Sequence, residues 1–288
     1  MKEKKKKTDH LLALIREGRP MTSGEQLRLT VALSIPAIVT QLSAIVMQYI
    51  DAAMVGSLGA NASASIGLVS TTTWLFWGLC AAASTGFSVQ VAHRIGAGDW
   101  DCARSILRRS VPSTFAFSAL LAAIGVSVSG ALPQWLGGDS AIRSDASLYF
   151  LIFSLFLPIL QMNFLAAGML RCSGNMRIPS IAGVLMCILD VVFNFFLIFP
   201  SRELSVGGLT LSIPGAGLGV QGAALGTGLA ESVAAAITLW YLFTRSSGLK
   251  IKAWRKSPSL PTPPIVRNSI RISLPLSLIH ISEPTRQE

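Results

Sequence analysis

Charged residues divide most of the chain into six long apolar blocks. The blocks cover approximately residues 30–57, 64–89, 110–132, 147–169, 178–200 and 217–243. Each is longer than the roughly 20 residues that an α-helix needs to cross the hydrocarbon core of a bilayer. The pattern predicts an all-α polytopic membrane protein with six transmembrane helices joined by short polar loops.

The first block carries two residues that are unfavourable in lipid. Pro36 removes a backbone hydrogen bond from the expected helix, and Asp51 puts a carboxylate at membrane depth. An intramembrane acid costs about 2.5–3.5 kcal/mol on insertion scales and marks a candidate functional site. Asp51 is therefore a candidate ion-binding residue. Pro36 is a candidate hinge, with a static kink packed by neighbouring helices as the alternative.

The distribution of Lys and Arg predicts the orientation in the membrane. Basic residues precede the first block, occupy the loops at 90–109 and 170–177 and follow the sixth block, whereas the alternate loops carry Arg143 and Arg202. By the positive-inside rule, both ends of the six-helix unit are cytosolic and the Gly-rich 201–216 loop is extracytoplasmic. We expect a multi-pass protein of a bacterial or archaeal cytoplasmic (inner) membrane with a cytosolic N-terminus and a lipid environment.

Composition excludes several other classes of protein. With 51% hydrophobic and 13% charged residues, the chain is too apolar for a soluble protein. The net charge of +10 comes from cations between the apolar blocks rather than along one face, so we expect no nucleic-acid partner. Cys80, Cys102, Cys172 and Cys187 lack the spacing of a zinc site or a disulfide framework.

Sequence motifs for catalysis and cofactor binding are missing or out of context. The sequence has no GxxxxGK[ST] or HExxH, and we expect neither an enzyme nor a resident cofactor. Residues 217–222 fit GxGxxG, but no strand is predicted before them, so dinucleotide binding is improbable. Gly222 and Gly226 form GxxxG, which predicts close approach of another helix.

Only three ionisable residues lie inside the six blocks, and all are acids: Asp51, Asp190 and Glu231. A site lined by carboxylates suits a cation, a proton or both. Asn194 follows Asp190 by one helical turn and Thr227 precedes Glu231 by one turn, so each pair shares a helix face. In straight helices, Asp51, Asp190, Asn194 and Thr227 fall in one layer in the outer half of the membrane. The alternative for each acid is a structural hydrogen bond between helices.

The segment after the sixth block resembles the beginning of the first span. Residues 28–36 read RLTVALSIP and residues 267–275 read RNSIRISLP, and internal repeats of this kind are typical of secondary transporters. This predicts a basic cytosolic tail (1–28), a six-helix lobe (29–246), a Pro-rich cytosolic linker (247–267) and the start of a seventh helix (268–275).

Residues 276–286 read LSLIHISEPTR and resemble the translation of a transposase-type sequencing adaptor. We therefore expect the segment 276–288 to be non-native and the chain to be an N-terminal fragment, with a genuine amphipathic tail as the alternative.

Four stretches together resemble the multidrug and toxic compound extrusion (MATE) family of cation-coupled antiporters, and the likeness covers about residues 25–275. The stretches are PAIVTQLSAIVMQYIDAAMVGSLG, VAHRIGAGDWDCAR, RCSGNMRIP and GVQGAALGTGLAE. The resemblance implies a twelve-helix protein in two six-helix lobes, of which this chain supplies the N-lobe and lacks the C-terminal lobe. It also implies export of organic cations or drugs in antiport with H+ or Na+, by alternating access.

By this resemblance, Asp51 is the first-helix acid of the family, Asp190 and Asn194 are the polar pair of the fifth helix, and Thr227 is the sixth-helix hydroxyl. These four residues are the candidate H+ or Na+ site. Archaeal members tend to have Asn before Asp in the fifth-helix pair, and the order here is reversed. Additional candidate residues are Glu231 and Gln41.

Two other functional classes stay open. A lipid-linked saccharide flippase of the same wider superfamily would commonly have a cationic central cavity, and a non-transporting membrane scaffold would need no buried acids. Three intramembrane acids without buried cations favour the exporter. In the mechanism that we hypothesise, protonation or Na+ binding at Asp51 and Asp190 reshapes the first helix at Pro36 and expels a bound cation.

Overall fold

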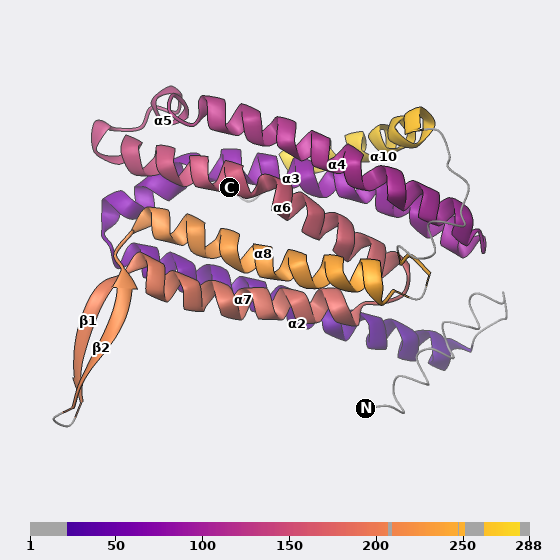
Figure 1. The fold of residues 1–288 in the computed structure, drawn as a ribbon, viewed down its shortest axis with the longest axis horizontal. Helices are drawn as coiled ribbons and strands as arrows, with labels where there is room; N and C mark the ends of the chain where they lie inside the picture. The colour runs from indigo at the N-terminus through magenta and orange to yellow at the C-terminus, as the bar shows by residue number, and fades with distance from the viewer. Residues whose placement is uncertain (1–21, 207–208, 247, 251–261, 283–288) are drawn as a thin grey trace.

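The structure, a computed structural model, describes residues 22–206, 209–246, 248–250 and 262–282. Within these ranges, six helices are long and apolar enough to cross a membrane, which confirms the six predicted spans. Figure 1 shows them side by side in one bundle. They are α2 (Ser23–Gly56), α3 (Ala60–Gly96), α4 (Trp100–Val128), α6 (Ser140–Cys172), α7 (Arg177–Ile198) and α8 (Val220–Thr244).

Capping residues move the helix ends beyond the predicted blocks. α2 begins at Ser23 rather than at residue 29, because Thr22 and Glu25 form a capping box: the Thr22 N–H donates to Glu25 Oε2 at 2.9 Å, and the Glu25 N–H donates to Thr22 Oγ1 at 3.4 Å. Asp139 caps α6 by accepting from the Ala141 N–H at 3.0 Å, and this bond lowers the pKa of Asp139. The part of the predicted tail before Thr22 lies outside the described residues.

The predicted loop at 90–109 is mostly helical. α3 extends to Gly96 and α4 starts at Trp100, so three residues connect them. Gly98 supplies a left-handed turn at φ +76°, and the Asp99 carboxylate accepts from the Cys102 N–H at 3.0 Å. The prediction of a loop is wrong because charged residues at the membrane boundary do not end an α-helix, which can continue into water.

The predicted loop at 201–216 is a β-hairpin, which the sequence analysis missed. β1 (Pro200–Val206) and β2 (Leu209–Ala216) pair antiparallel, and Figure 1 shows the hairpin projecting from one end of the bundle. One further short helix, α5 (Leu132–Trp135), lies between α4 and α6. Neither element changes the helical architecture of the bundle.

The seventh helix, α10 (Thr262–Ser282), starts earlier than predicted. The predicted boundary at residue 268 is wrong because prolines 263 and 264 fall in the first turn, where a helix has unpaired N–H groups anyway. α10 also continues through Pro275 to Ser282, into the segment 276–288 that was expected to be non-native. The remainder of the suspected non-native tail, 283–288, lies outside the described residues, and its origin stays a prediction.

Side-chain hydrogen bonds attach α10 to α3. Gln90 Nε2 donates to Ser269 Oγ at 2.6 Å and to the Ile265 carbonyl at 3.2 Å, and Ser273 Oγ donates to the Ala82 carbonyl at 2.8 Å. α10 therefore packs as part of the six-helix lobe.

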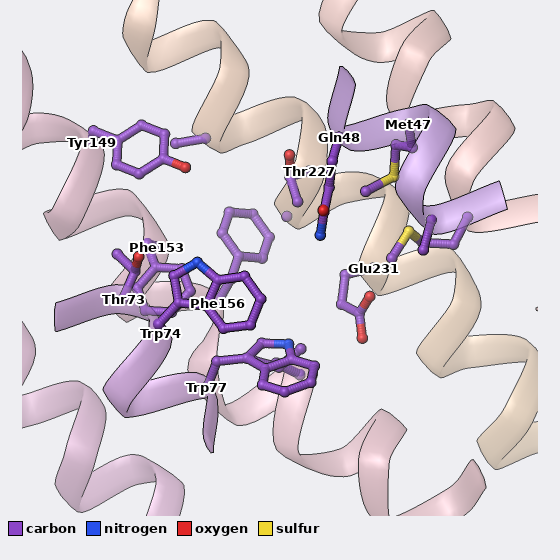
Figure 2. A pocket seen from close by; sticks show the side chains of 15 residues that line it. Met47, Gln48, Thr73, Trp74, Trp77, Tyr149, Phe153, Phe156, Thr227 and Glu231 are labelled. Atoms are coloured by element: carbon purple, nitrogen blue, oxygen red, sulfur yellow. The ribbon is translucent and has the colours of Figure 1, made fainter. Parts of the chain in front are cut away.

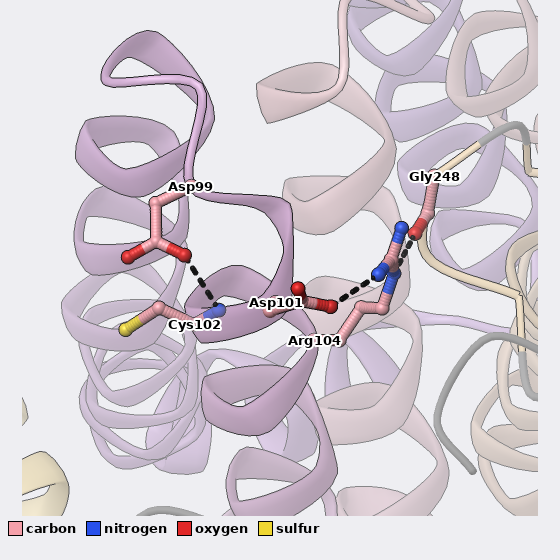
Figure 3. A network of polar contacts seen from close by, with 5 residues as sticks. All are labelled: Asp99, Asp101, Cys102, Arg104 and Gly248. Atoms are coloured by element: carbon pink, nitrogen blue, oxygen red, sulfur yellow. Dashed lines mark hydrogen bonds and ion pairs between the residues drawn. The ribbon is translucent and has the colours of Figure 1, made fainter. Parts of the chain in front are cut away.

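The chain just after α8 is also attached to the lobe, at the start of α4 (Figure 3). Arg104 Nε donates to the Gly248 carbonyl at 2.7 Å, while its Nη1 bonds to Asp101 Oδ1 at 2.7 Å. The Trp100 ring packs against Gly248, where an added Cβ would lie 3.0 Å from the ring atom Cη2. Leu249 is fully buried in a core shared with α3, α4 and α6. Residues 248–250, the first described residues of the predicted linker (247–267), are thus packed against the lobe.

Candidate functional site

Two carboxylates and one amide meet between α2 and α7. Asp51 comes from the last turns of α2, and Asp190 and Asn194 lie one turn apart on α7. Asn194 Nδ2 donates to Asp51 Oδ1 at 2.9 Å and to Asp190 Oδ2 at 3.2 Å. We call these three residues the acid–amide triad. The structure brings together three of the four residues of the predicted layer through direct hydrogen bonds.

The fourth predicted residue, Thr227 of α8, lies next to the triad. Its side chain is close to the Asp190 carboxyl, and Thr227 lines the same cavity as Asp51 and Asn194. This cavity, which we call the triad cavity, has a volume of about 340 Å³. The layer predicted from helix periodicity is therefore assembled in three dimensions.

The interior of the triad is strongly buried, and two of its oxygens lack protein partners. The side chains of Asp190 and Asn194 are 0% and 1% exposed. Among the described residues, Asp190 Oδ1 and Asn194 Oδ1 are buried without a hydrogen-bond partner. An unpaired buried acceptor costs about 1–3 kcal/mol, so a proton or cation bound here would be stabilised.

The oxygen chemistry of the site fits a proton or a hard cation. Asp51, Asp190, Asn194 and Thr227 offer carboxylate, amide and hydroxyl oxygens, and two of these oxygens are unpaired. Among the described residues, no three His, Cys, Asp or Glu side chains cluster as a transition-metal site would require. The residues present thus suit Na+ or H+ better than a transition metal.

Close packing of α8 on α7 fixes the position of Asn194. A Cβ added at Gly222 would lie 2.6 Å from the Leu197 carbonyl carbon, and one at Gly226 would lie 3.0 Å from Asn194 Cγ. Both distances are shorter than normal carbon contacts of about 3.5–4.0 Å. The structure therefore confirms the prediction that the GxxxG pair lets a second helix approach closely.

A second cavity of about 300 Å³ adjoins the first, and five aromatic side chains line it (Figure 2). Trp74 and Trp77 of α3 and Tyr149, Phe153 and Phe156 of α6 line it, and Figure 2 shows Trp74, Phe153 and Phe156 on the side away from Glu231. We call it the aromatic cavity. Its lining shares three residues with the triad cavity, and these form a common wall: Gln48, Tyr149 and Thr227.

Glu231 belongs to the aromatic cavity rather than to the triad. Its side chain is 7% exposed, and its Oε1 accepts from Asn163 Nδ2 at 2.7 Å. The side-chain amide oxygen of Asn163, Oδ1, in turn accepts from the Thr238 hydroxyl at 2.8 Å. Of the three predicted intramembrane acids, Asp51 and Asp190 share one site while Glu231 has its own hydrogen-bond network.

Two other predicted residues lie apart from the triad. Gln41 is exposed on α2 and lines neither cavity. Pro36 lies inside α2, which stays helical on both sides of it. Thr40 donates to the Pro36 carbonyl at 2.8 Å and packs over α7, where a Cβ at Gly183 would lie 2.7 Å from Thr40 Cγ2. The helix segment just after Pro36 is thus in close contact with α7.

Sequence reasoning missed the aromatic cavity and Asn163. Asn163 is a polar residue in the fourth apolar block, so its presence was a usable signal. Aromatic residues are common in membrane helices, and no sequence feature separates the rings that face the cavity from those that face lipid.

The three residues of the acid–amide triad fall within a match to a known family. The family model described as MatE matches residues 36–196, more than half of the chain. The chain belongs to the MATE family. It is therefore a multi-pass membrane protein of a transporter family and not an enzyme, which confirms the resemblance noted in the sequence.

Curated MATE relatives are distant and longer than this chain. The "Probable multidrug resistance protein NorM" of Thermotoga maritima is 25% identical over 218 residues, which is 75% of this chain and 44% of that protein. The "FAD transporter" of Shewanella oneidensis is 23% identical over 188 residues, which is 64% of this chain and 42% of that protein. The chain thus spans less than half the length of these two relatives.

Solved MATE structures share the fold. A MOP superfamily transporter from Pyrococcus furiosus matches with a TM-score of 0.76 and 24% identity, covering 92% of this chain and 56% of that chain. The inward-facing conformation of a multidrug resistance MATE family transporter matches with a TM-score of 0.70 and 23% identity, covering 82% of this chain and 50% of that one. The described helices therefore have the architecture of one lobe of such a transporter.

Proposed function

We propose that this lobe belongs to a secondary active exporter that moves organic cations or other xenobiotics out of the cell in antiport with H+ or Na+. The observation that carries the proposal is the Asn194 amide, which bridges carboxylates from two helices at 2.9 and 3.2 Å. In this proposal the protein lies in a bacterial or archaeal cytoplasmic membrane with its N-terminus in the cytosol, as the distribution of cations favours.

The acid–amide triad is the proposed coupling site. Two buried carboxylates held by one amide repel each other when both are charged, and a proton or Na+ relieves this repulsion. An ion at the unpaired oxygens of Asp190 and Asn194 would change how the amide holds Asp51. Because Asp51 is the only member of the triad on α2, ion binding changes the attraction of α2 for α7.

Pro36 is the proposed hinge that converts this change into movement. It lacks the N–H that would close the helical hydrogen bond at its position, so α2 bends there at lower cost than elsewhere. Bending moves Gln48 and Asp51 together, because both lie on the same helix after the proline. The resulting change in the cavity lining would release a bound substrate toward the outside.

Cavity chemistry favours cationic substrates over the two alternatives. Among the described residues, the linings of the triad and aromatic cavities contain Asp51 and Glu231 and no Lys, Arg or His. An anionic ligand such as FAD or a lipid-linked pyrophosphate would meet these carboxylates without a compensating cation in either described lining. A scaffold without transport activity would have no use for a buried acidic pair, which is costly in a membrane.

The test is gradient-driven efflux of a fluorescent cation from cells that express the gene at its full length. Asp51→Asn keeps the shape of the side chain and removes its charge, so we expect correct membrane insertion and efflux at background level. Asp145→Asn, on the half-buried face of α6 outside both cavities, is the matched control and should export normally. Unchanged efflux in the Asp51 variant would sink the proposal.

A further inference from the structure

The two acidic centres of the lobe are built independently. Asp51 and Asp190 are held by Asn194 between α2 and α7, whereas Glu231 is held by Asn163 between α6 and α8. Each carboxylate centre thus has its own amide and its own cavity. This separation was not expected from the sequence, where all three acids were candidates for one ion site.

The network behind Glu231 fixes its orientation. The Thr238 hydroxyl donates to Asn163 Oδ1 at 2.8 Å, which turns Asn163 Nδ2 toward Glu231 Oε1 at 2.7 Å. The hydrogen bond donated by the Asn163 amide favours the charged form of the carboxylate, and a cationic ligand beside it would favour that form further. Figure 2 shows Glu231 and Trp77 among the side chains that line the aromatic cavity.

The rings that line the aromatic cavity are held at fixed angles. The rings of Trp74 and Trp77 have centroids 5.7 Å apart with an interplanar angle of 57°, and Trp77 packs edge-on against Phe164 at 5.1 Å and 88°. Phe156 lies directly against α8, because a Cβ at Gly228 would lie 2.6 Å from its Cγ. Ring faces attract cations, and a carboxylate beside them adds charge selectivity.

We infer that Glu231 and these rings form the binding site for a flat aromatic monocation, and that the substrate does not share a carboxylate with the coupling ion. This inference rests on the proposed function and assigns its two ligands to two different cavities. The volume of about 300 Å³ suits a compact ligand. Glu231 binds the charged nitrogen of the ligand, and the rings of Trp77 and Phe156 stack with the ligand's aromatic part.

The shared wall couples the two cavities. Gln48, Tyr149 and Thr227 line both, and they come from α2, α6 and α8. Gln48 lies one turn before Asp51 on α2, so a movement of α2 that follows ion binding also changes the wall of the aromatic cavity. Ion and substrate therefore influence each other through a movable wall rather than by competition for one acid.

The experiment measures ethidium binding by fluorescence anisotropy to the purified full-length protein. We expect Glu231→Gln to raise the Kd at least about tenfold, as loss of a charge-assisted contact does. Glu231→Asp should recover part of the affinity, and Trp77→Leu should weaken binding with the acid intact. Asp51→Asn acts on the aromatic cavity only through the shared wall, so it should weaken ethidium binding less than Glu231→Gln does. Ser232→Ala, on the neighbouring position of α8, is the matched control for folding.

Each outcome decides the inference. It is overturned if Asp51→Asn weakens binding as much as Glu231→Gln does, which would mean one shared acidic site, or if Glu231→Gln binds as the parent does. Should Glu231→Gln fail to fold, the Glu231→Asp and Trp77→Leu affinities decide in the same way. Failure of the proposed function gives a different result, because efflux would then be unaffected by Asp51→Asn whatever the binding data show.

Discussion

The contact between Gly226 and Asn194 allows a quantitative prediction. A Cβ at Gly226 would lie 3.0 Å from Asn194 Cγ and 3.1 Å from the Asn194 backbone nitrogen, about 0.5 Å closer than normal packing allows. The side chain can rotate away from the new methyl group, but the backbone nitrogen cannot. Gly226→Ala must therefore push α7 away from α8 or expel the amide from the triad.

Both responses cost stability. Overpacking a well-packed interface costs typically about 1–3 kcal/mol. If the amide also leaves the triad, two hydrogen bonds to carboxylates are lost, each contributing about 1.5–3 kcal/mol. We expect the free energy of unfolding of Gly226→Ala to fall by about 1–3 kcal/mol when the helices separate slightly, and by more when the amide is expelled.

The assay is unfolding of the purified protein in detergent, with Gly67→Ala as the matched control. Gly67 also lies inside a helix, but an added Cβ there has no atom within 4 Å. Removing the flexibility of glycine should leave that variant unchanged or stabilise it by about 0.5–1 kcal/mol. Equal stability of the two variants would refute the packing argument for Gly226.

Two further predictions concern the attachments of residues 248–250 and α10 to the lobe. Arg104→Ala removes the 2.7 Å bond to the Gly248 carbonyl, so limited trypsin digestion should cut the chain after α8 about tenfold faster, while the exposed Arg108→Ala should not change the rate. Gln90→Ala removes the bonds to Ser269 and to a backbone carbonyl of α10, so amide hydrogen exchange of α10 should accelerate about fivefold or more. Arg108→Ala is again the control, and equal exchange in both variants would show that the Gln90 contact does not hold the helix.

Much of the fold is predictable because the bilayer imposes a simple pattern. Six apolar blocks gave six helices, since every backbone polar group in lipid must be paired within a helix. The errors lie outside that constraint. α2 begins earlier than predicted because of the Thr22 capping box, and α10 begins earlier than predicted because its prolines fit a first turn. The β-hairpin was missed because its segment was predicted to be a loop from its Gly and Pro content alone.

The candidate site was predictable where periodicity and charge act together. Asp190 and Asn194 share a helix face by spacing alone, and the cost of isolated intramembrane charge predicted that Asp51 would find a polar partner. The assignment of Glu231 to a separate network required knowledge of which residue of α6 faces it. Helix rotation about its own axis depends on packing, so the partnership with Asn163 could not be read from one sequence.

Glycines on α8 constrain how this lobe can change during evolution. Gly222 and Gly226 face backbone atoms of α7 and Gly228 faces the Phe156 ring, so closely that any side chain would displace a neighbouring helix or that ring. Variation at these positions would alter both cavities at once and is therefore a poor route to a new substrate range. The rings of Trp74, Trp77 and Phe153 line the aromatic cavity from the opposite side, where exchange between aromatic and aliphatic side chains changes its shape while the backbones stay in place. Substrate range can thus diversify on α3 and α6 while α8 stays unchanged.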